Sequence, residues 1–185
     1  MLSITDLKTG TKLIMEQDPY VVLSYSHSKM GRGGAVVKTK LKNLKTGATI
    51  DKTFQGADKV YEAELSKKNM TYLYSDGNNA FFMDNESFEQ VEIAEEKIGA
   101  NKDYLVENSS IDVLFFNNEP INIELPIKMS FAITEAPPAV KGNSQGTITK
   151  KATIETGALI DVPIFIKEGD KIVVDTRDGS YVERA

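Results

Sequence analysis

The sequence contains no cysteine among its 185 residues and only one histidine, His27. Disulfide bonds, thiolate metal sites and cysteine nucleophiles are therefore excluded, and the composition fits a reducing compartment. His27 has no cysteine to pair with, and no G-x-S-x-G or H-E-x-x-H motif surrounds it. We interpret His27 as a surface or loop residue and not as a catalytic base.

The chain also lacks a hydrophobic run of the ~20 residues that a membrane span requires. Near the N-terminus, Asp6 and Lys8 occupy positions where a signal peptide would need apolar residues. The glycines of GRGG, residues 31–34, form neither a phosphate-binding loop nor a dinucleotide fingerprint. We therefore expect a cytoplasmic protein that is not an enzyme, with no catalytic residue, metal, cofactor or membrane contact.

Acidic residues cluster in the segment 84–92, but their spacing is not that of a calcium loop. The cluster consists of Asp84, Glu86, Glu89 and Glu92. We expect these four side chains to form a solvated face.

Charge is distributed unevenly along a chain whose formal net charge is -5. Residues 1–65 hold ten basic and seven acidic side chains, whereas residues 66–128 hold five basic and twelve acidic ones. Residues 129–185 are nearly balanced, with seven basic and eight acidic side chains. A polyanionic partner would be attracted by the first third and repelled by the middle third. We expect the middle third to face away from RNA.

Hydrophobic residues recur with a period of two, which is typical of half-buried strands. The segments AVVKTKLKN, residues 35–43, and INIEL, residues 121–125, both alternate in this way. Turn signals occur at residues 17–20, 45–47, 75–79, 117–120 and 177–180. The only helices expected are short ones near Ala94–Ile98, ended by Gly99, and around Gly56–Val60. The pattern predicts an all-β protein.

The strands and turns group into three blocks of about 60 residues, a size typical of SH3-like and OB-type barrels. We predict an SH3-like N-terminal domain at residues 1–64 that contains a basic hairpin. Two OB-like domains are predicted to follow, at residues 65–128 and 129–185.

The segment 26–47 contains six Lys or Arg and no acidic residue. Its part SKMGRGG lies between two predicted strands, so it is expected to form the tip of a β-hairpin. Glycines at positions 31, 33 and 34 allow positive φ angles and a close approach to a partner. Arg32 is the one long side chain at this tip, and its guanidinium suits phosphate, ribose and base edges.

Three lysines continue the positive charge along one face of the strand that follows the tip: Lys38, Lys40 and Lys42. Because the acid-free segment is long, we predict that this hairpin contacts RNA. The alternative is a flexible, solvated hairpin.

At these residues the sequence resembles bacterial elongation factor P. The family's loop reads approximately K-P-G-K/R-G-x-A-x-V-K/R-x-K-L-K/R-N, and the chain matches it except that Met30 replaces the proline. The matching residues are Lys29, Gly31, Arg32, Gly33, Ala35, Val37, Lys38, Lys40, Leu41, Lys42 and Asn43. The C-terminal segment 150–185 carries the family's K-x-A, E-T-G, V-P and E-G-D-K-I landmarks, and FQGADKV and NNEPINIELP match between the two ends.

The resemblance implies a KOW-type first domain and two OB-like domains arranged in an L. It implies a translation factor that binds the ribosome between the peptidyl and exit sites. There such a factor steadies the CCA end of peptidyl-tRNA and stimulates peptide-bond formation at consecutive prolines. The implied partners are ribosomal RNA and peptidyl-tRNA, and the chain is expected to be a monomer.

The resemblance also assigns roles to individual residues. Arg32 is the implied CCA-end contact and a candidate modification site, supported by Lys29, Met30, Gly31, Gly33 and Gly34. Tyr181 and Arg184, in the family's closing Y-x-x-R-A, are the implied contacts with the small subunit or tRNA. The implied exit-site loop contains Gly142, Asn143 and Ser144, where the family's usual G-D-T is replaced.

An arginine at the tip restricts the modification chemistry, because its lone pair is delocalised and it stays protonated. Lysylation and hypusine-like chemistry are therefore not expected at Arg32. Rhamnosylation by a dedicated modifying enzyme and an unmodified arginine both remain open.

Three alternatives to this assignment exist. A close paralogue of elongation factor P would share the fold and the arginine tip. A general single-strand-binding OB module would need stacking aromatics on a basic groove. The available phenylalanines, Phe81, Phe82, Phe115 and Phe116, lie in the acidic middle third, where core packing is the better interpretation. A small-molecule enzyme would need catalytic groups that the sequence lacks.

Overall fold

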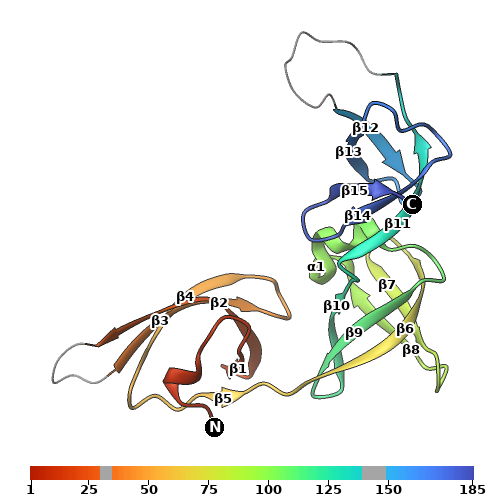
Figure 1. Ribbon diagram of the computed structural model, residues 1–185. Helices are drawn as coiled ribbons and strands as arrows, with labels where there is room; N and C mark the ends of the chain where they lie inside the picture. The colour runs from red at the N-terminus through yellow and green to blue at the C-terminus, as the bar shows by residue number, and fades with distance from the viewer. Residues whose placement is uncertain (30–34, 139–148) are drawn as a thin grey trace.

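The computed structural model describes residues 1–29, 35–138 and 149–185. These residues form three five-stranded antiparallel sheets that follow one another along the chain. The first sheet forms one arm of an L, and the second and third sheets are stacked in the other arm (Figure 1). The expected all-β, L-shaped fold is thus confirmed.

The first sheet has the strand order β4-β3-β2-β1-β5. Its strands are β1 (Lys12–Met15), β2 (Asp18–Lys29), β3 (Ala35–Asn43), β4 (Thr49–Gln55) and β5 (Tyr61–Glu62). A short 3-10 helix, η1 (Ile4–Asp6), precedes them and is capped by Ser3, whose side chain accepts a hydrogen bond from the Thr5 backbone. The turn between β1 and β2 lies at Glu16 and Gln17, which both have positive φ as a type I′ turn requires.

The second sheet comprises β6 (Leu65–Ser75), β7 (Asn79–Asp84), β8 (Gln90–Ala94), β9 (Ser110–Phe116) and β10 (Glu119–Glu124). The third comprises β11 (Lys128–Glu135), β12 (Thr149–Ile154), β13 (Leu159–Pro163), β14 (Lys171–Asp175) and β15 (Ser180–Arg184). In both sheets the first strand is central, the next two lie on one side and the last two on the other. This shared 3-2-1-4-5 order is that of two barrels with the same topology.

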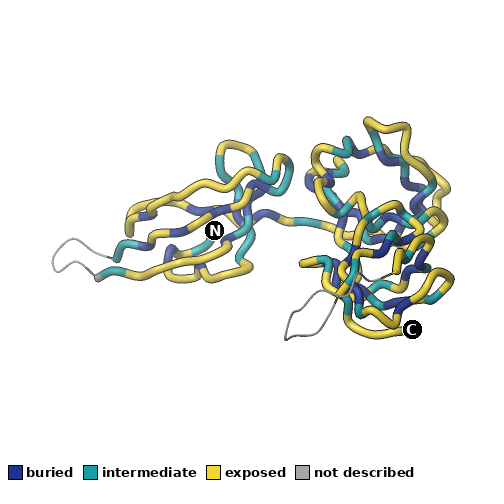
Figure 2. The backbone as a smooth tube through the Cα atoms, turned by 90° about the horizontal axis from the view of Figure 1, so that it is seen from above, coloured by how far each residue is buried: buried dark blue, intermediate teal, exposed yellow. Residues whose placement is uncertain are grey.

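Each sheet curls around a core of its own, so that buried residues run through the interior and exposed residues cover the outside (Figure 2). Leu13, Val37 and Leu41 are completely buried in the first core. Phe82 and Ile111 fill the second. Period-two burial is the cause, because alternate strand residues point to opposite faces.

The second and third sheets are joined by packing as well as by the chain. The connection β8–β9 contains α1 (Glu95–Ile98) and a 3-10 helix, η3 (Gly99–Tyr104). Tyr104 at the end of η3 packs against Phe131 of the third core, with ring centroids 5.9 Å apart. The Thr156 hydroxyl donates to the Asp103 carbonyl at 2.6 Å. These contacts dock the third domain on the middle one.

Two local predictions need correction. No helix forms at residues 56–60, because the Asp58 carboxylate accepts from the Gln55 backbone N–H at 2.8 Å and closes a turn there. Asp84 is not part of the solvated face: it is 9% exposed, accepts from the backbone N–H groups of Glu86 and Ser87, and pairs with Lys68. The predicted helix near Ala94–Ile98 is confirmed as α1.

Candidate nucleic-acid interface

Strands β2 and β3 form a long arm of the first domain (Figure 1), and β4 pairs along the other edge of β3 from Val36 to Lys42. The register of β2 and β3 runs without interruption from Ser24 opposite Lys40 to Lys29 opposite Ala35. A bulge between Val22 and Ser24 shifts the pairing of β2 with β3. Bulges increase the local twist and bend a strand, so this one redirects the arm.

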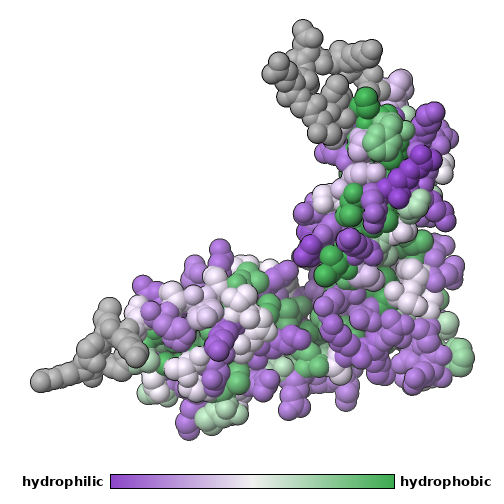
Figure 3. Space-filling model, in the orientation of Figure 1, coloured by the Kyte–Doolittle hydropathy of each residue, from purple (hydrophilic) through white to green (hydrophobic). Residues whose placement is uncertain are grey.

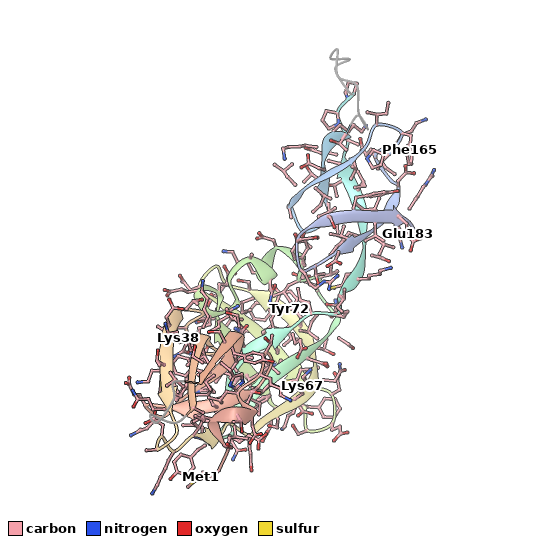
Figure 4. All side chains as sticks on the ribbon, turned by 60° about the vertical axis from the view of Figure 1, so that its left-hand side comes forward. Met1, Lys38, Lys67, Tyr72, Phe165 and Glu183 are labelled. Atoms are coloured by element: carbon pink, nitrogen blue, oxygen red, sulfur yellow. The ribbon has the colours of Figure 1, made fainter. Side chains whose placement is uncertain are left out.

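Lysines line the outer face of the arm, as the sequence predicts. In β3, Val37, Thr39, Leu41 and Asn43 are buried, whereas Lys38, Lys40 and Lys42 are exposed. Lys38 lies between Ser26 and Thr53 of the neighbouring strands, and Lys40 lies between Ser24 and Asp51. Figure 4 shows Lys38 on this sheet. The buried Thr39 hydroxyl is satisfied by the Lys52 carbonyl at 3.0 Å.

These lysines are available to an anionic partner. Among the described residues, none of the ion pairs within 4.0 Å involves Lys38, Lys40 or Lys42. Asp51 is the one carboxylate directly opposite a lysine of this face in the register. A row of flexible ammonium groups flanked by hydroxyl side chains suits phosphate groups and offers no base-specific geometry.

The opposite face of the arm carries an aromatic pair that sequence reasoning missed. Tyr25 is 40% exposed and meets His27 edge to face, with ring centroids 5.3 Å apart. Lys52 lies on the same face, because Thr39 of β3 is opposite Tyr25 on one side and opposite Lys52 of β4 on the other. His27 is therefore a surface residue, but it lies in a strand and not in a loop. The i, i+2 spacing of the two rings was the available signal, and such rings can stack on bases or riboses.

Two predicted third-domain residues lie on β15, in the other arm of the L (Figure 1). Tyr181 and Arg184 both belong to β15. The Tyr181 ring is partly buried against the third core, whereas Arg184 is exposed and pairs with Asp170 at 2.7 Å. A partner that uses the Arg184 guanidinium must therefore share it with Asp170 or replace Asp170.

Several predicted site residues fall outside the described part of the chain. These are Met30, Gly31, Arg32, Gly33 and Gly34 of the hairpin tip, and Gly142, Asn143 and Ser144 of the third-domain loop. Lys29 is described through its backbone, which pairs with Ala35 at the end of the arm.

Two phenylalanines of the middle domain, Phe82 and Phe115, belong to its core. Phe82, Phe115 and Phe116 are buried, and Tyr72, labelled in Figure 4, packs with Phe82 at 5.5 Å. Phe81 is partly exposed and stacks on Tyr74 of the neighbouring strand, with centroids 4.8 Å apart. The neighbour of Phe81 on the other side is Glu92, so this pair does not lie in a basic groove.

No helix in ranges 1–29, 35–138 and 149–185 has the length and hydrophobicity needed to cross a bilayer. No group of three or more His, Asp or Glu side chains in these ranges could hold a metal ion.

Comparison with known proteins gives matches to each part of the chain. The family model of the elongation factor P KOW-like domain matches residues 3–60. The model of the elongation factor P OB domain matches residues 65–123, and that of the elongation factor P C-terminal domain matches residues 129–184.

Whole proteins match over the same length. Elongation factor P of Moorella thermoacetica is 44% identical over 185 residues, covering 100% of both chains. Elongation factor P of Desulfotalea psychrophila is 44% identical over 184 residues, covering 100% of this chain and 98% of the relative. That of Mesomycoplasma hyopneumoniae is 46% identical over 184 residues, with 100% of both chains covered.

A solved structure of eukaryotic translation initiation factor 5A from Methanococcus jannaschii superposes with a TM-score of 0.53 and 18% identity. It covers 66% of this chain and 92% of that chain, and at this identity the likeness shows the fold alone. The bacterial relatives show more, because they align from end to end. The chain therefore belongs to the elongation factor P family, whose members are translation factors and not classical enzymes.

Proposed function

We propose that this protein binds the ribosome between the peptidyl and exit tRNA sites and stimulates peptide-bond formation at consecutive prolines. In this proposal the arm of the first domain reaches the CCA end of peptidyl-tRNA and Arg32 contacts it. The protein acts in the cytoplasm as a monomer of three domains, with boundaries after residues 64 and 128. Its partners are ribosomal RNA and peptidyl-tRNA.

The physical basis is the restriction of a mobile reactant. Proline is a poor donor and acceptor of the peptidyl group, so a peptidyl-tRNA that ends in proline rarely samples the reactive geometry. A factor that holds the CCA end still lowers the entropic part of the barrier while the ribosome supplies the chemistry. Such a factor needs reach, a cationic surface and a fixed shape, but no catalytic group of its own.

The observation that carries the proposal is the arm itself, in a chain that belongs to a translation factor family. It presents Lys38, Lys40 and Lys42 on one exposed face, free of ion pairs among the described residues. The middle domain carries the excess of acidic residues and would be repelled by RNA at close range. The charge distribution thus favours an orientation in which the arm meets RNA.

The remaining assignments complete the proposal. Tyr181 and Arg184 contact the small subunit or its tRNA, and the loop with Gly142, Asn143 and Ser144 lies toward the exit-site mRNA. Arg32 is either modified by a dedicated enzyme or acts as a free guanidinium. Both versions keep a planar, cationic group at the tip.

The salt dependence of ribosome binding tests the role of the arm. We expect the triple variant Lys38→Gln, Lys40→Gln, Lys42→Gln to bind ribosomes more weakly. The slope of log K against log salt is negative, and its magnitude should decrease by about 2 to 3. Each lost phosphate contact reduces that magnitude by roughly 0.7 to 0.9. Cosedimentation over a salt series measures both quantities.

The matched control removes three exposed lysines from the middle domain: Lys67→Gln, Lys97→Gln, Lys102→Gln. This variant has the same net charge as the first, so a general charge effect would alter both slopes equally. Equal slopes for the two variants would contradict the assignment of the arm as the electrostatic contact.

A further inference from the structure

The junction between the first and middle domains contains a hydrophobic cluster separate from all three domain cores. Its buried members are Ala63, Phe116 and Ile121, and residues of both domains pack around them: Ile14, Leu44, Leu65 and Leu114. On the face shown in Figure 3, hydrophobic residues are visible at the bend between the two arms of the L. The first domain thus packs against the middle domain in addition to being connected to it by the chain.

The first domain contributes the turn that follows β3. The buried Asn43 side chain accepts from the backbone N–H groups of Lys45 and Thr46 at 2.8 and 3.0 Å. Gly47 completes the turn with φ +75, a conformation that favours glycine. The Leu44 backbone N–H donates to the Pro19 carbonyl at 2.9 Å. These bonds give the turn a defined shape and present Leu44 and Lys45 to the middle domain.

Lys45 bridges the two domains through its ammonium group. Its Nζ lies 5.7 Å from the centroid of the Phe116 ring, within cation–π range, and 3.0 Å from Asp18 Oδ1. Asp18 also accepts from the Asn43 side chain at 3.1 Å. The hydrogen bond from Lys45, together with that from Asn43, lowers the pKa of Asp18 below its ordinary value. The carboxylate therefore stays ionised at neutral pH and holds the ammonium over the ring.

The middle domain contributes a bulge in β10. The register of β9 and β10 shifts between Pro120 and Asn122, so that Ile121 is the extra residue and Asn122 lies opposite Leu114. Its Nδ2 donates to the Leu44 carbonyl at 3.5 Å and to the Lys97 carbonyl at 3.2 Å. Its Oδ1 accepts from the Ile123 backbone at 2.8 Å. One amide thereby connects β10, the end of α1 and the first-domain turn.

The docked turn directly follows the strand that carries the lysines. From Asn43 to Ala35, β3 rises roughly 26 Å over eight steps. A rotation of about 10° at the turn would displace the far end of the strand by roughly 4 to 5 Å. Such a displacement exceeds the tolerance of a positioned reactive group, since a shift of about 1 Å can cost about 100-fold in rate. We call the junction of the first and middle domains, formed by the hydrophobic cluster with Lys45 and Asn122, the elbow. The contacts at the elbow therefore control the direction of the arm.

We propose that Lys45 and Asn122 are positioning residues that fix the angle between the first and middle domains. The hydrophobic cluster holds the domains together but is non-directional, whereas the hydrogen bonds and the cation over the ring select one orientation. The functional part of this inference rests on the proposed function, because it assumes that the arm must meet a defined target. The structural part, a fixed elbow, stands on the contacts alone.

The test measures the elbow directly by pulsed electron spin resonance. Because the chain has no cysteine, spin labels can be placed at Thr53→Cys and Gln90→Cys without background. A second pair, Gln90→Cys with Glu183→Cys, spans only the middle and third domains. We expect a single narrow distance distribution for the first pair. In Lys45→Gln, Asn122→Ala, the undocked fraction should rise about fivefold or more, and the second pair should not change.

Matched controls separate orientation from charge and stability. Lys151→Gln, Asn69→Ala removes the same groups from exposed sites elsewhere and should leave both distributions unchanged. Lys45→Arg keeps a cation over Phe116 and should therefore keep the narrow distribution of the wild-type protein. An unchanged width in the double variant, or a broad distribution in the wild-type protein, would overturn the inference.

Reporter translation tests the functional part. With Lys45→Gln, Asn122→Ala we expect rescue of a reporter with three consecutive prolines to fall about tenfold, at unchanged far-UV circular dichroism. A broadened elbow with full rescue would overturn the positioning role. If the wild-type protein itself fails to rescue the reporter, the proposed function is refuted, while the spin-label distances still decide whether these residues fix the elbow.

Discussion

Gly179 faces a side chain of another domain, which makes it a probe of the junction between the middle and third domains. It has φ +73, and a Cβ built at this position would lie 2.6 Å from the hydroxyl oxygen of Tyr104. Gly169, in the same domain, has φ +83 and nothing within 4 Å of a Cβ. Both glycines therefore have a positive φ, but only Gly179 has a side chain of another domain, Tyr104, where a Cβ would lie.

The difference between two alanine variants isolates the contact. We expect Gly169→Ala to destabilise the protein by about 1 to 2 kcal/mol, the cost of a left-handed conformation for a residue with a Cβ. Gly179→Ala should lose a further ~1 to 3 kcal/mol, because the Tyr104 ring packs against Phe131 and must shift. At about 2 to 4 °C per kcal/mol for a chain of this size, an added 2 kcal/mol lowers the melting temperature by roughly 4 to 8 °C more.

Differential scanning calorimetry of a double-mutant cycle completes the test. Tyr104→Phe removes only the hydroxyl, so Gly179→Ala in that background should recover most of the added loss. Gly169→Ala should cost the same in both backgrounds. If Gly179→Ala is no worse than Gly169→Ala, or if Tyr104→Phe gives no recovery, the close approach of the two domains at this point is wrong.

Three further outcomes are expected. Arg32→Ala should change the stability by less than ~0.5 kcal/mol but abolish rescue of the polyproline reporter. Arg32→Lys should also rescue the reporter far less than wild type, because the planar fork of the guanidinium is lost. Full rescue by Arg32→Lys would refute the guanidinium argument. The Arg177 guanidinium and backbone lower the pKa of Asp175 to about 2, so this pair stabilises the fold above pH ~4 and the contribution is lost as the pH falls toward ~2. In Arg177→Gln, NMR titration should show a higher Asp175 pKa, and an unchanged midpoint would contradict the ion pair. Crosslinking on ribosomes should yield few contacts from residues 84–96, and extensive crosslinks there would contradict the proposed orientation.

Period-two patterning made β3 fully predictable. The alternation of lysines with Val37, Thr39 and Leu41 gave the strand and its exposed face, and both are observed. The turn at residues 45–47 was predictable for a similar reason, because Asn and Gly supply the side-chain acceptor and the positive φ that a tight turn needs. Local chemistry determines these features, and a single sequence carries it.

Features that depend on a partner strand or domain could not be predicted in this way. The bulges at Val22/Ser24 and Pro120/Asn122 arise from register with a neighbouring strand, which no local pattern encodes. Phe116 and Ile121 read as ordinary core residues in sequence, although they face another domain. The prediction of a helix at residues 56–60 was wrong, because the Asp58 side chain accepts a hydrogen bond that closes a turn there. The capping sequence of η1, with Ser3 and Asp6, was a local signal that could have been used.

The two junctions of the chain differ in kind, and this difference has a mechanical consequence. At the middle–third junction Met129 packs against both domain cores and Tyr104 enters the third, so rotation there would disrupt packing on both sides. At the first–middle junction the cluster is separate from the cores, so a change of angle would leave each core intact. Variants at the elbow should therefore alter the direction of the arm while each domain keeps its own stability. Variants at Tyr104 or Gly179 should affect stability first, because there the junction and a core are the same set of contacts.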